Sequence, residues 1–378
     1  MMWGIYIHIP FCHYKCIYCD FDSGVYSPSL IADYLAALQQ EILRAGEDDA
    51  LSGLVADTIY FGGGTPSVLR GEDIEEILDT VRRCFALREP MEITLEANPG
   101  TLTREKVRRY ASAGVNRVSV GAQSFHDEEL KMLGRIHTVE EVHRSVDVLR
   151  DAGIENINLD VIAGLPHQTM DRWQRTMDAL FALHPPHVSM YLLDVHEETA
   201  LATLIRKNVL PPPDEDLMAA FYYAFVDRAT AEGYEHYEIS NFCRPGHQSR
   251  HNLKYWSDQP YLGFGCSAHS YDLTRRWWNI PTPTAYIGAM RTQGIARAGV
   301  IPLTPEERAR EALFLGLRRR EGINLSDFSQ RYGVDVLTRY GPDLESLREH
   351  GLIEWEGGQL KLTRKGLILA NEVFTVFV

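Results

Sequence analysis

The chain has 378 residues and a formal net charge of −14, from 38 basic and 52 acidic side chains. This acidic balance argues against a nucleic-acid partner, because phosphate binding needs clustered Lys and Arg. Hydrophobic residues make up 45% of the chain and charged residues 24%, which is ordinary for a globular protein with a full core. No secretory leader is evident, and no run approaches the roughly 20 apolar residues of a membrane span. We therefore expect a cytoplasmic protein in a reducing compartment.

The first predicted strand leads into a loop with three cysteines, Cys12, Cys16 and Cys19. Iron–sulfur clusters are normally held by four thiolates, so a loop that supplies three leaves one iron open to another ligand. The alternatives are a structural zinc site, completed by His13 or a remote donor, and a chance spacing. A disulfide framework is disfavoured because three cysteines cannot all pair with one another.

Strands and helices alternate over the first two thirds of the chain. The predicted strands are short apolar runs, at residues 2–9, 58–61, 91–95, 117–120, 157–162 and 187–193. The predicted helices have apolar residues at a period of 3.6, at residues 28–46, 73–85, 103–113, 126–133, 139–152, 170–183 and 214–232. Six strand–helix units in succession predict an α/β fold with a parallel sheet, a partial (β/α)6 barrel over residues 1–235.

Unusual residues gather where these predicted strands end. The cysteine loop follows the first strand and a triple glycine at 62–64 follows the second, while Glu96, Gln123 and Asp160 lie at or near later strand ends. Barrel enzymes build their active sites at that end of the strands. Glycines allow a ligand to approach the backbone closely, although a tight turn explains them equally well. The sequence therefore predicts one site shared by several strands.

The polar residues of this predicted site each have two interpretations. Glu96 and Asp160 are carboxylates whose burial is costly unless they are bonded. They suit the hydroxyl groups of a ribose, or a salt bridge with Arg117 or Arg135. Gln123 donates and accepts at once, which suits a nucleoside or a carboxylate, or a core amide bonded to the backbone.

After residue 232 the pattern becomes aromatic and glycine-rich, and we predict a connecting segment over 236–297. It contains the run His-Asn-Leu-Lys-Tyr-Trp, which begins at His251. Imidazole is a standard axial ligand of heme iron, and a buried structural histidine is the alternative.

A C-terminal winged-helix-like α+β domain is predicted over residues 298–378. Its predicted elements are helices at 306–319, 325–332 and 337–349 and a hairpin over 352–362 that turns at two glycines. The basic run 318–320 is a weak basis for DNA binding, so packing beside the barrel is favoured. The apolar run 373–378 is too short to span a bilayer. Core packing is favoured for it over peripheral membrane contact.

Short segments along nearly the whole chain match one family. They are YIHIPFC at 6–12, CDFDS at 19–23, GGGTPS at 62–67, EANPG at 96–100, QSF at 123–125, LGRIH at 133–137, NLD at 158–160, GLP at 164–166 and HNLKYW at 251–256. With these segments the chain resembles the oxygen-independent coproporphyrinogen III oxidase-like family of radical S-adenosylmethionine (SAM) proteins. Within that family it is most similar to the heme chaperone branch.

The resemblance implies a [4Fe-4S] cluster on Cys12, Cys16 and Cys19, with SAM bound to the open iron. Tyr18 precedes the third cysteine and is implied to lie beside the cluster. Positions that match SAM contacts are Tyr6, Gly63, Gly64, Thr65, Glu96, Gln123, Arg135 and Asp160. A homodimer is implied by the resemblance alone.

Two departures from the true oxidases decide between the branches. Those enzymes have a further cysteine two positions after the third, where this chain has Phe21, and they carry an extension before the first strand. The branch with both departures is implied to bind heme and to deliver it to respiratory hemoproteins, and the segment that begins at His251 is its candidate heme element. The alternative function is a coproporphyrinogen III dehydrogenase, a radical SAM enzyme that forms protoporphyrinogen IX by oxidative decarboxylation. The sequence favours the heme chaperone and leaves enzymatic use of SAM open.

Overall fold

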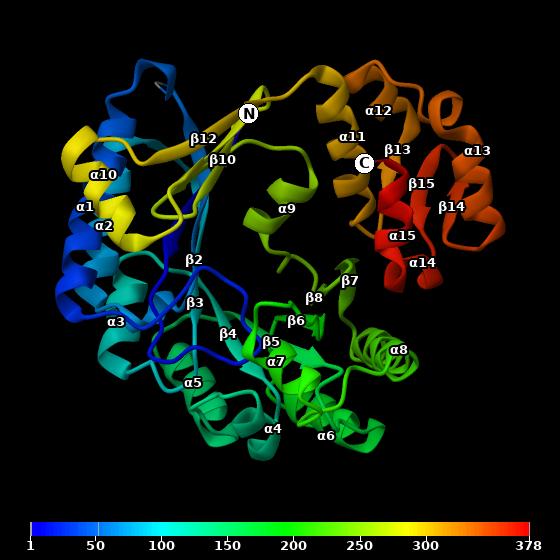
Figure 1. Ribbon diagram of the computed structural model, residues 1–378, viewed down its shortest axis with the longest axis horizontal. Coiled ribbons are helices and arrows are strands. Elements are labelled where there is room, and N and C mark those ends of the chain that lie inside the picture. The colour runs from blue at the N-terminus through cyan, green and yellow to red at the C-terminus, as the bar shows by residue number, and fades with distance from the viewer. Residues whose placement is uncertain (1, 52, 378) are drawn as a thin grey trace.

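The computed structural model describes residues 2–51 and 53–377 and places a curved, twelve-stranded sheet beside a small C-terminal domain (Figure 1). The centre of the sheet consists of parallel strands in sequence order, each paired with the next. They are β1 (Trp3–Ile9), β2 (Val55–Gly63), β3 (Ala86–Ala97), β4 (Arg117–Gln123), β5 (Asn156–Ala163) and β6 (His187–Leu192). The predicted α/β fold with a partial parallel barrel is confirmed.

Further strands continue the sheet at both edges, and the sequence pattern did not predict them. Beyond β1 lie β9 (Tyr261–Phe264), β10 (His269–Tyr271), β11 (Arg275–Asn279) and β12 (Arg297–Pro302). Beyond β6 lie β8 (Asn241–Cys243) and β7 (Glu235–Glu238). Strand β9 runs parallel to β1, with Gly4 opposite Tyr261, so β1 is an internal strand. The domain boundaries over this segment stay a prediction.

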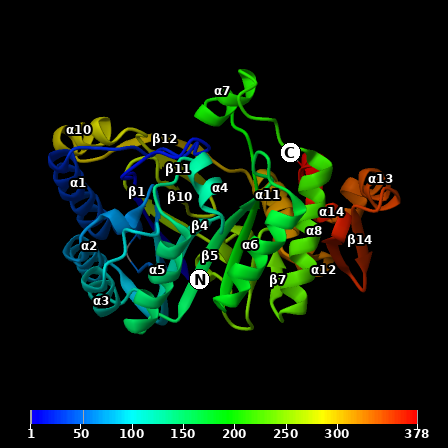
Figure 2. The same ribbon diagram turned by 90° about the horizontal axis from the view of Figure 1, so that it is seen from below.

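Helices cover the outside of the curved sheet (Figure 1). These are α1 (Pro28–Gly46), α2 (Gly71–Cys84), α3 (Arg104–Ser112), α4 (Asp127–Met132), α5 (Val139–Asp151), α6 (Met170–Ala182) and α8 (Glu215–Ala231). Helix α10 (Pro283–Gln293) packs against α1. The short helix α7 (Ala200–Arg206), which was not predicted, stands away from this layer at the top of Figure 2.

The core lies between the sheet and these outer helices. In β1 the side chains of Ile5, Ile7 and Ile9 are fully buried. Because side chains alternate along a strand, Tyr6 and His8 share the opposite face, where the Tyr6 hydroxyl lies 3.1 Å from Nδ1 of His8. That inner face is therefore left for polar and aromatic side chains.

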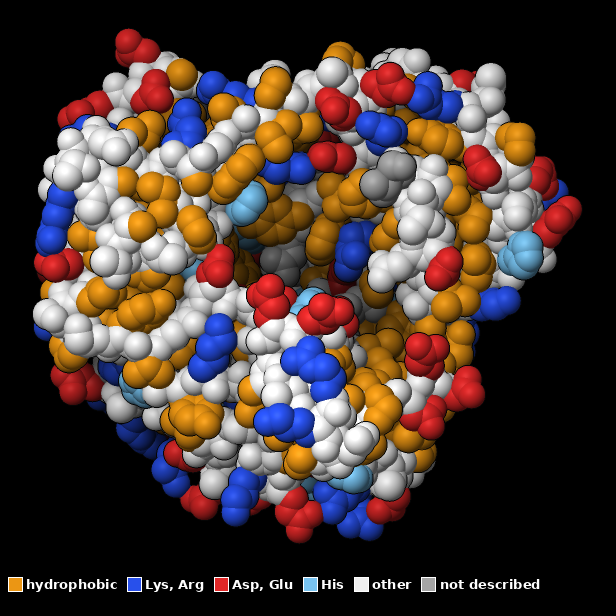
Figure 3. Space-filling view, viewed as in Figure 1, with side chains coloured by type: hydrophobic (Ala, Val, Ile, Leu, Met, Phe, Trp, Pro, Cys, Tyr) orange, Lys and Arg blue, Asp and Glu red, His pale blue; other side chains and the backbone are white. Residues whose placement is uncertain are grey.

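The C-terminal domain has the predicted helices and hairpin. Its elements are α11 (Pro305–Leu317), β13 (Ile323–Asn324), α12 (Leu325–Tyr332), α13 (Val336–Glu349), β14 (Ile353–Glu356), β15 (Gln359–Leu362), α14 (Arg364–Ile368) and α15 (Ala370–Phe374). The face in Figure 3 is hollowed near its middle, where Figure 1 shows α9 (Arg250–Trp256) between the sheet and this domain.

The basic run 318–320 packs against the barrel side of the molecule, as favoured. The amide of Ile239 donates to the carbonyl of Arg318 and that of Arg320 donates to the carbonyl of Tyr237. The Arg318 guanidinium lies over the ring of Trp256, 4.4 Å from its centre. These arginines therefore join the C-terminal domain to the sheet.

The apolar C-terminal run also packs into the core. Val373, Phe374 and Phe377 are buried, while residue 378 lies outside the described residues. Over residues 2–51 and 53–377, no helix combines the length and the apolar character that a membrane crossing requires.

Candidate functional site

The cysteine loop is closed at its base by backbone hydrogen bonds. The amide of Cys12 donates to the carbonyl of Gly24 at 2.8 Å, and the amide of Gly24 donates to the carbonyl of Pro10 at 2.9 Å. Lys15 Nζ donates to the carbonyls of Phe21 and Ser23, at 3.0 and 3.1 Å. These bonds fix the two ends of the loop against each other.

A small apolar cluster holds the middle of the loop from the other side. The amide of Ile17 donates to the carbonyl of Leu133 at 3.2 Å, and the amide of Leu201 donates to the carbonyl of Ile17 at 2.8 Å. Ile17 packs on a satellite core that contains Leu133 and Leu201. Helix α7, which carries Leu201, thus supports the cysteines.

All three cysteine thiols are free and half-buried. The Sγ of Cys12 lies 3.5 Å from the Thr65 hydroxyl, and Nη1 of Arg135 donates to the Sγ of Cys16 at 3.4 Å. Burial raises the pKa of the Cys19 thiol. Among the described residues, no three His, Cys, Asp or Glu side chains are arranged to hold a single metal ion. A cluster offers each thiolate a separate iron, so it does not need that convergence.

The thiols open into a cavity of about 420 Å³ on the inner face of the sheet, a size typical of small-molecule sites. Nearly all of the predicted site residues line it, and they come from the ends of different strands. They are Cys12, Cys16, Tyr18, Cys19, Gly63, Gly64, Thr65, Glu96, Gln123, Arg135 and Asp160. The structure therefore brings these predicted residues together.

The glycines of the run 62–64 pack closely against the cysteine loop. A Cβ at Gly64 would lie 2.8 Å from the carbonyl oxygen of Phe11. Gly63 has φ of +113°, and a Cβ there would lie 2.6 Å from the ring of His8. Larger residues at either position would push the cysteine loop or β1 away.

Two carboxylates face the same cavity from neighbouring strands. Glu96 accepts a 2.7 Å hydrogen bond from the hydroxyl of Tyr60, and burial raises its pKa to about 7. Asp160 accepts bonds from Ser119 and Asn158, at 3.1 and 2.7 Å, and burial also raises its pKa. Neither carboxylate forms a salt bridge with Arg117 or Arg135 among the ion pairs of residues 2–51 and 53–377. Both therefore keep capacity to accept from a ligand.

Arg135 is bonded instead to four groups, one of which is Nδ1 of His137, 3.4 Å from its Nε. Its Nη2 donates to Oδ1 of Asn98 and to the carbonyl of Gly121, both at 2.7 Å, besides its contact with the Cys16 thiol. Arg135 therefore ties the cysteine loop to the ends of β3 and β4.

The sequence analysis missed further polar residues that line the cavity. They are Tyr60, Asn98, Ser119, Asn158, Ser189 and Tyr191. Asn158 Nδ2 donates to Asp160 and to the hydroxyls of Ser119 and Ser189, at 2.7 to 2.9 Å. Their signal was present, because polar residues recur at every second position of strands that are otherwise apolar.

Arg117, which the sequence analysis named only as a possible salt-bridge partner, also lines the cavity. Its side chain is 1% exposed, and its Nε has no hydrogen-bond partner. Its charge acts on Glu96 and Asp160, and lowers the pKa of each against the larger effect of burial. It therefore serves as an internal counter-charge for both carboxylates.

Two of the predicted residues lie outside this cavity. Tyr6 lines a neighbouring cavity, which shares Gly63 and Glu96 with the first. His251 is 1% exposed and lines neither cavity. Its Nδ1 lies 2.9 Å from the Thr58 hydroxyl and its Nε2 lies 2.9 Å from the Tyr255 hydroxyl, so both ring nitrogens have partners.

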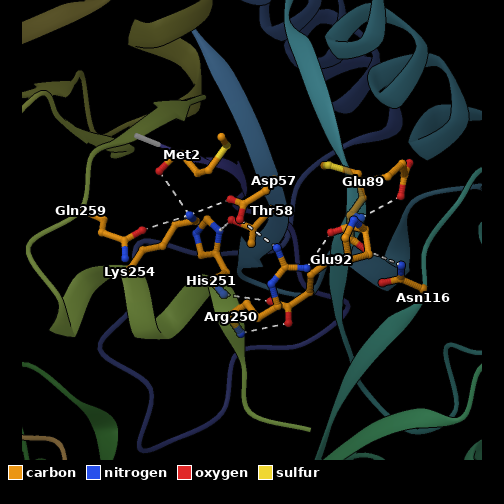
Figure 4. Close-up of polar contacts among 12 residues, drawn as sticks. Met2, Asp57, Thr58, Glu89, Glu92, Asn116, Arg250, His251, Lys254 and Gln259 are labelled. Carbon is orange, nitrogen blue, oxygen red and sulfur yellow. Dashed lines mark hydrogen bonds and ion pairs between the residues drawn. The ribbon is translucent and has the colours of Figure 1, made fainter. Parts of the chain in front are cut away.

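Charged residues hold α9 and its His251 in place (Figure 4). The amides of Arg250 and His251 both donate to Glu92 at 2.9 Å, and Lys254 Nζ pairs with Asp57 at 2.6 Å. Asp57 lies near the start of β2 and Glu92 near the middle of β3, whereas the cysteine loop follows the end of β1 and the triple glycine lies at the end of β2. Burial lowers the pKa of His251 to about 3. The structure thus places His251 in a neutral, bonded setting away from the cysteines.

Comparisons with known proteins agree with one another. The profile of the Radical SAM superfamily matches residues 6–180, and that of the HemN C-terminal domain matches residues 303–369. "Heme chaperone HemW" of Bacillus subtilis is 36% identical over 100% of this chain and 99% of its own length. The protein of that name from Escherichia coli is 40% identical over 70% of this chain and 69% of its own length.

A solved structure shows the same fold over the whole chain. Coproporphyrinogen III oxidase (HemN) from Escherichia coli, described as a radical SAM enzyme, superimposes with a TM-score of 0.88 at 25% identity. The match covers 100% of this chain and 90% of that one. The chain therefore belongs to the radical SAM family and, within it, to the HemN-like proteins whose full-length relatives include HemW.

Proposed function

We propose that this protein binds heme and passes it to another protein, while Cys12, Cys16 and Cys19 hold a [4Fe-4S] cluster whose open iron binds SAM. The observation that carries the proposal is the single cavity that joins the three free thiols to the strand-end residues. The radical SAM family implies both cofactors, and the heme function is taken from the name of full-length relatives.

The residues present fit a cluster with SAM beside it. Three thiols supply one ligand fewer than a cluster needs, and Arg135 places a positive charge against the Cys16 sulfur. Glu96 and Asp160 would accept hydrogen bonds from the ribose hydroxyls. Gln123 would accept a hydrogen bond from the nucleoside or donate one to it. When bound, the cluster and SAM together would supply one-electron chemistry. The protein's part is to orient SAM and to exclude water.

Phe21 favours heme binding over porphyrinogen oxidation. It stands where the related oxidases have a further cysteine, and its side chain is 64% exposed at the edge of the cavity. An exposed phenylalanine leaves apolar surface in water that a flat, apolar ligand would cover.

Coproporphyrinogen III oxidation is the second candidate. The observation in its favour is the full-length structural match to HemN. Because one fold can serve different functions, this match supports the oxidase function without excluding the heme chaperone.

The test is an anaerobic reconstitution of the full chain with iron and sulfide, followed by two assays. One is a heme titration followed by absorption, and the other is coproporphyrinogen turnover with SAM and a reductant. The control is a variant with Cys12, Cys16 and Cys19 all replaced by Ala. We expect stoichiometric heme uptake and no decarboxylated product. Sustained formation of protoporphyrinogen would overturn the chaperone proposal in favour of the oxidase, and a loop saturated by zinc would overturn the cluster.

Three finer points complete the proposal. The recipients are respiratory hemoproteins, the protein acts in the cytoplasm with peripheral membrane contact at most, and it forms a homodimer. Each is tested directly, by heme transfer to an apo-cytochrome, by cell fractionation and by light scattering of the purified chain.

A further inference from the structure

A second cavity, of about 400 Å³, lies beside the cluster cavity. The two share Phe21, Gly63 and Glu96. The wall of the second cavity is otherwise built from β1, from the end of the cysteine loop and from the segment after residue 254, with Tyr6, His8, Asp22, Tyr255, Tyr261, Ser267 and His269. None of the cysteines lines it, so a ligand here would sit next to the cluster without replacing SAM.

Aromatic rings dominate this wall. Tyr255 and Tyr261 contact each other edge to face with ring centres 4.7 Å apart, and Tyr6 stacks on Tyr60 at 6.3 Å. The exposed ring of Phe21 stands at the boundary with the cluster cavity. Rings of this kind favour flat, conjugated ligands, with stacking and edge contacts adding to apolar burial.

The histidines near this cavity differ in whether their nitrogens are available. His8 is 6% exposed, and its nitrogens contact the Tyr6 hydroxyl at 3.1 Å and the Asp22 carbonyl at 3.3 Å. His251 is bonded at both nitrogens, as described above. His269 is exposed, and within residues 2–51 and 53–377 its ring takes part in no hydrogen bond or ion pair.

The ring of His269 is nevertheless held in orientation. It stacks on Trp278 of β11 with ring centres 5.9 Å apart and an angle of 21° between the planes. His269 and Trp278 are direct partners in the pairing of β10 with β11. Partial desolvation and the nearby charge of Arg276 lower the pKa of His269, in the direction that favours the neutral ring.

We propose that heme binds in this second cavity and that His269, rather than His251, is the axial ligand of its iron. The inference rests on the proposed function for the choice of heme, and on the geometry for the choice of cavity and ligand. Phe21 packs on the macrocycle at the side of the cluster cavity, and Tyr255 and Tyr261 line the other side. His251 then acts indirectly, by positioning Tyr255 through their hydrogen bond.

The test uses the full-length protein and ferric heme, with affinity measured by titration and ligation by absorption and electron paramagnetic resonance. His269→Ala is expected to weaken binding by about tenfold or more and to remove the histidine-ligated spectrum, and added imidazole is expected to restore that spectrum. His269→Met is expected to keep heme bound with a thioether spectrum. The matched control is His143→Ala, an exposed histidine within α5 that lines neither cavity.

The outcomes separate this inference from the function on which it rests. Wild-type protein that takes up no heme overturns the proposed function and this site with it. Stoichiometric uptake by the wild type, with affinity and spectrum unchanged in His269→Ala, overturns only this inference. Thermal unfolding of each variant is measured alongside, and a thioether spectrum in His269→Met supports the site even if His269→Ala is unstable.

Discussion

Arg135 donates from Nη1 to the sulfur of Cys16 at 3.4 Å, and the same guanidinium bonds to Asn98 and to the Gly121 carbonyl. One half-buried side chain therefore connects the cysteine loop to the ends of two strands. Because hydrogen bonds from a charged group contribute about 1.5–3 kcal/mol each, this contact fixes the loop against the strand ends.

Replacement of Arg135 by Leu is expected to reduce both cluster retention and stability. The substitution leaves the Gly121 carbonyl and Asn98 Oδ1 without their donor, so the free energy of unfolding should fall by about 2–3 kcal/mol. Iron and sulfide analysis after reconstitution, with urea unfolding, measures the two effects. Arg135→Lys is the matched control and should recover part of the iron content. Wild-type iron content in Arg135→Leu would contradict this role.

The six cysteines should divide into two groups on substitution. Cys12→Ala, Cys16→Ala and Cys19→Ala are each expected to lose the cluster, since a cluster held by three thiolates has no spare protein ligand. Cys84→Ala is the control, because Cys84 lies at the end of α2 and lines neither cavity. Iron content and visible absorption report the result. Equal iron loss in the control would place the metal elsewhere.

Glu96 should make both stability and SAM binding depend on pH. Burial raises its pKa to about 7, against the bonds from Tyr60 and the charge of Arg117, while Asp160 adds to the rise. The folded protein thus binds this proton more tightly than the unfolded chain. The stabilising contribution is complete below the ordinary carboxyl pKa and is lost as the pH rises through about 7.

The expected loss for the protein without SAM is up to about 3 kcal/mol, from the size of the pKa shift. SAM affinity is expected to rise over the same pH range, because the ionised carboxylate is the stronger acceptor for two hydroxyls. Glu96→Gln should remove this pH dependence from both urea unfolding and SAM calorimetry. A SAM affinity that is constant from acid to alkaline pH in the wild type would exclude Glu96 from the ribose site.

His251→Ala is expected to destabilise the protein without removing the histidine ligand of heme. The change leaves a cavity beside Tyr60 and frees the hydroxyls of Thr58 and Tyr255, at a cost of about 2–4 kcal/mol. Thermal unfolding measures the loss, and the heme spectrum reports ligation. His251→Gln, which can bond to both hydroxyls, should recover part of the stability. A heme spectrum without histidine ligation in a folded His251→Ala variant would assign the ligand to His251.

Much of the central fold could be predicted from local pattern. Helix α1 has the predicted bounds because its apolar period is long, and the hairpin at Gly357 and Gly358 follows from its turn residues. Strands β9 to β12 could not be predicted, because they are short and their pairing is decided by residues far away in the chain. Their aromatic and glycine content indicated an irregular segment instead.

The residues of the candidate site that belong to sequence motifs were predicted. The thiols and strand-end residues were found because each is unusual for its position. Ser119 and Asn158 were missed, and Arg117 was named only as a possible ion-pair partner, because a polar residue within a strand becomes significant only when its neighbours on the same face are known. The sequence also does not show whether an imidazole is bonded on both sides, which is what separates His251 from His269.

The pairing of β1 with β9 has a consequence for biosynthesis. The cysteines are among the first residues to leave the ribosome, yet the strand that supports them needs Tyr261–Phe264 as its neighbour. Bringing two such distant segments together costs loop-closure entropy that local contacts do not repay. The nascent chain therefore displays its thiols before their support exists, so we expect cluster assembly to follow release of a nearly complete polypeptide.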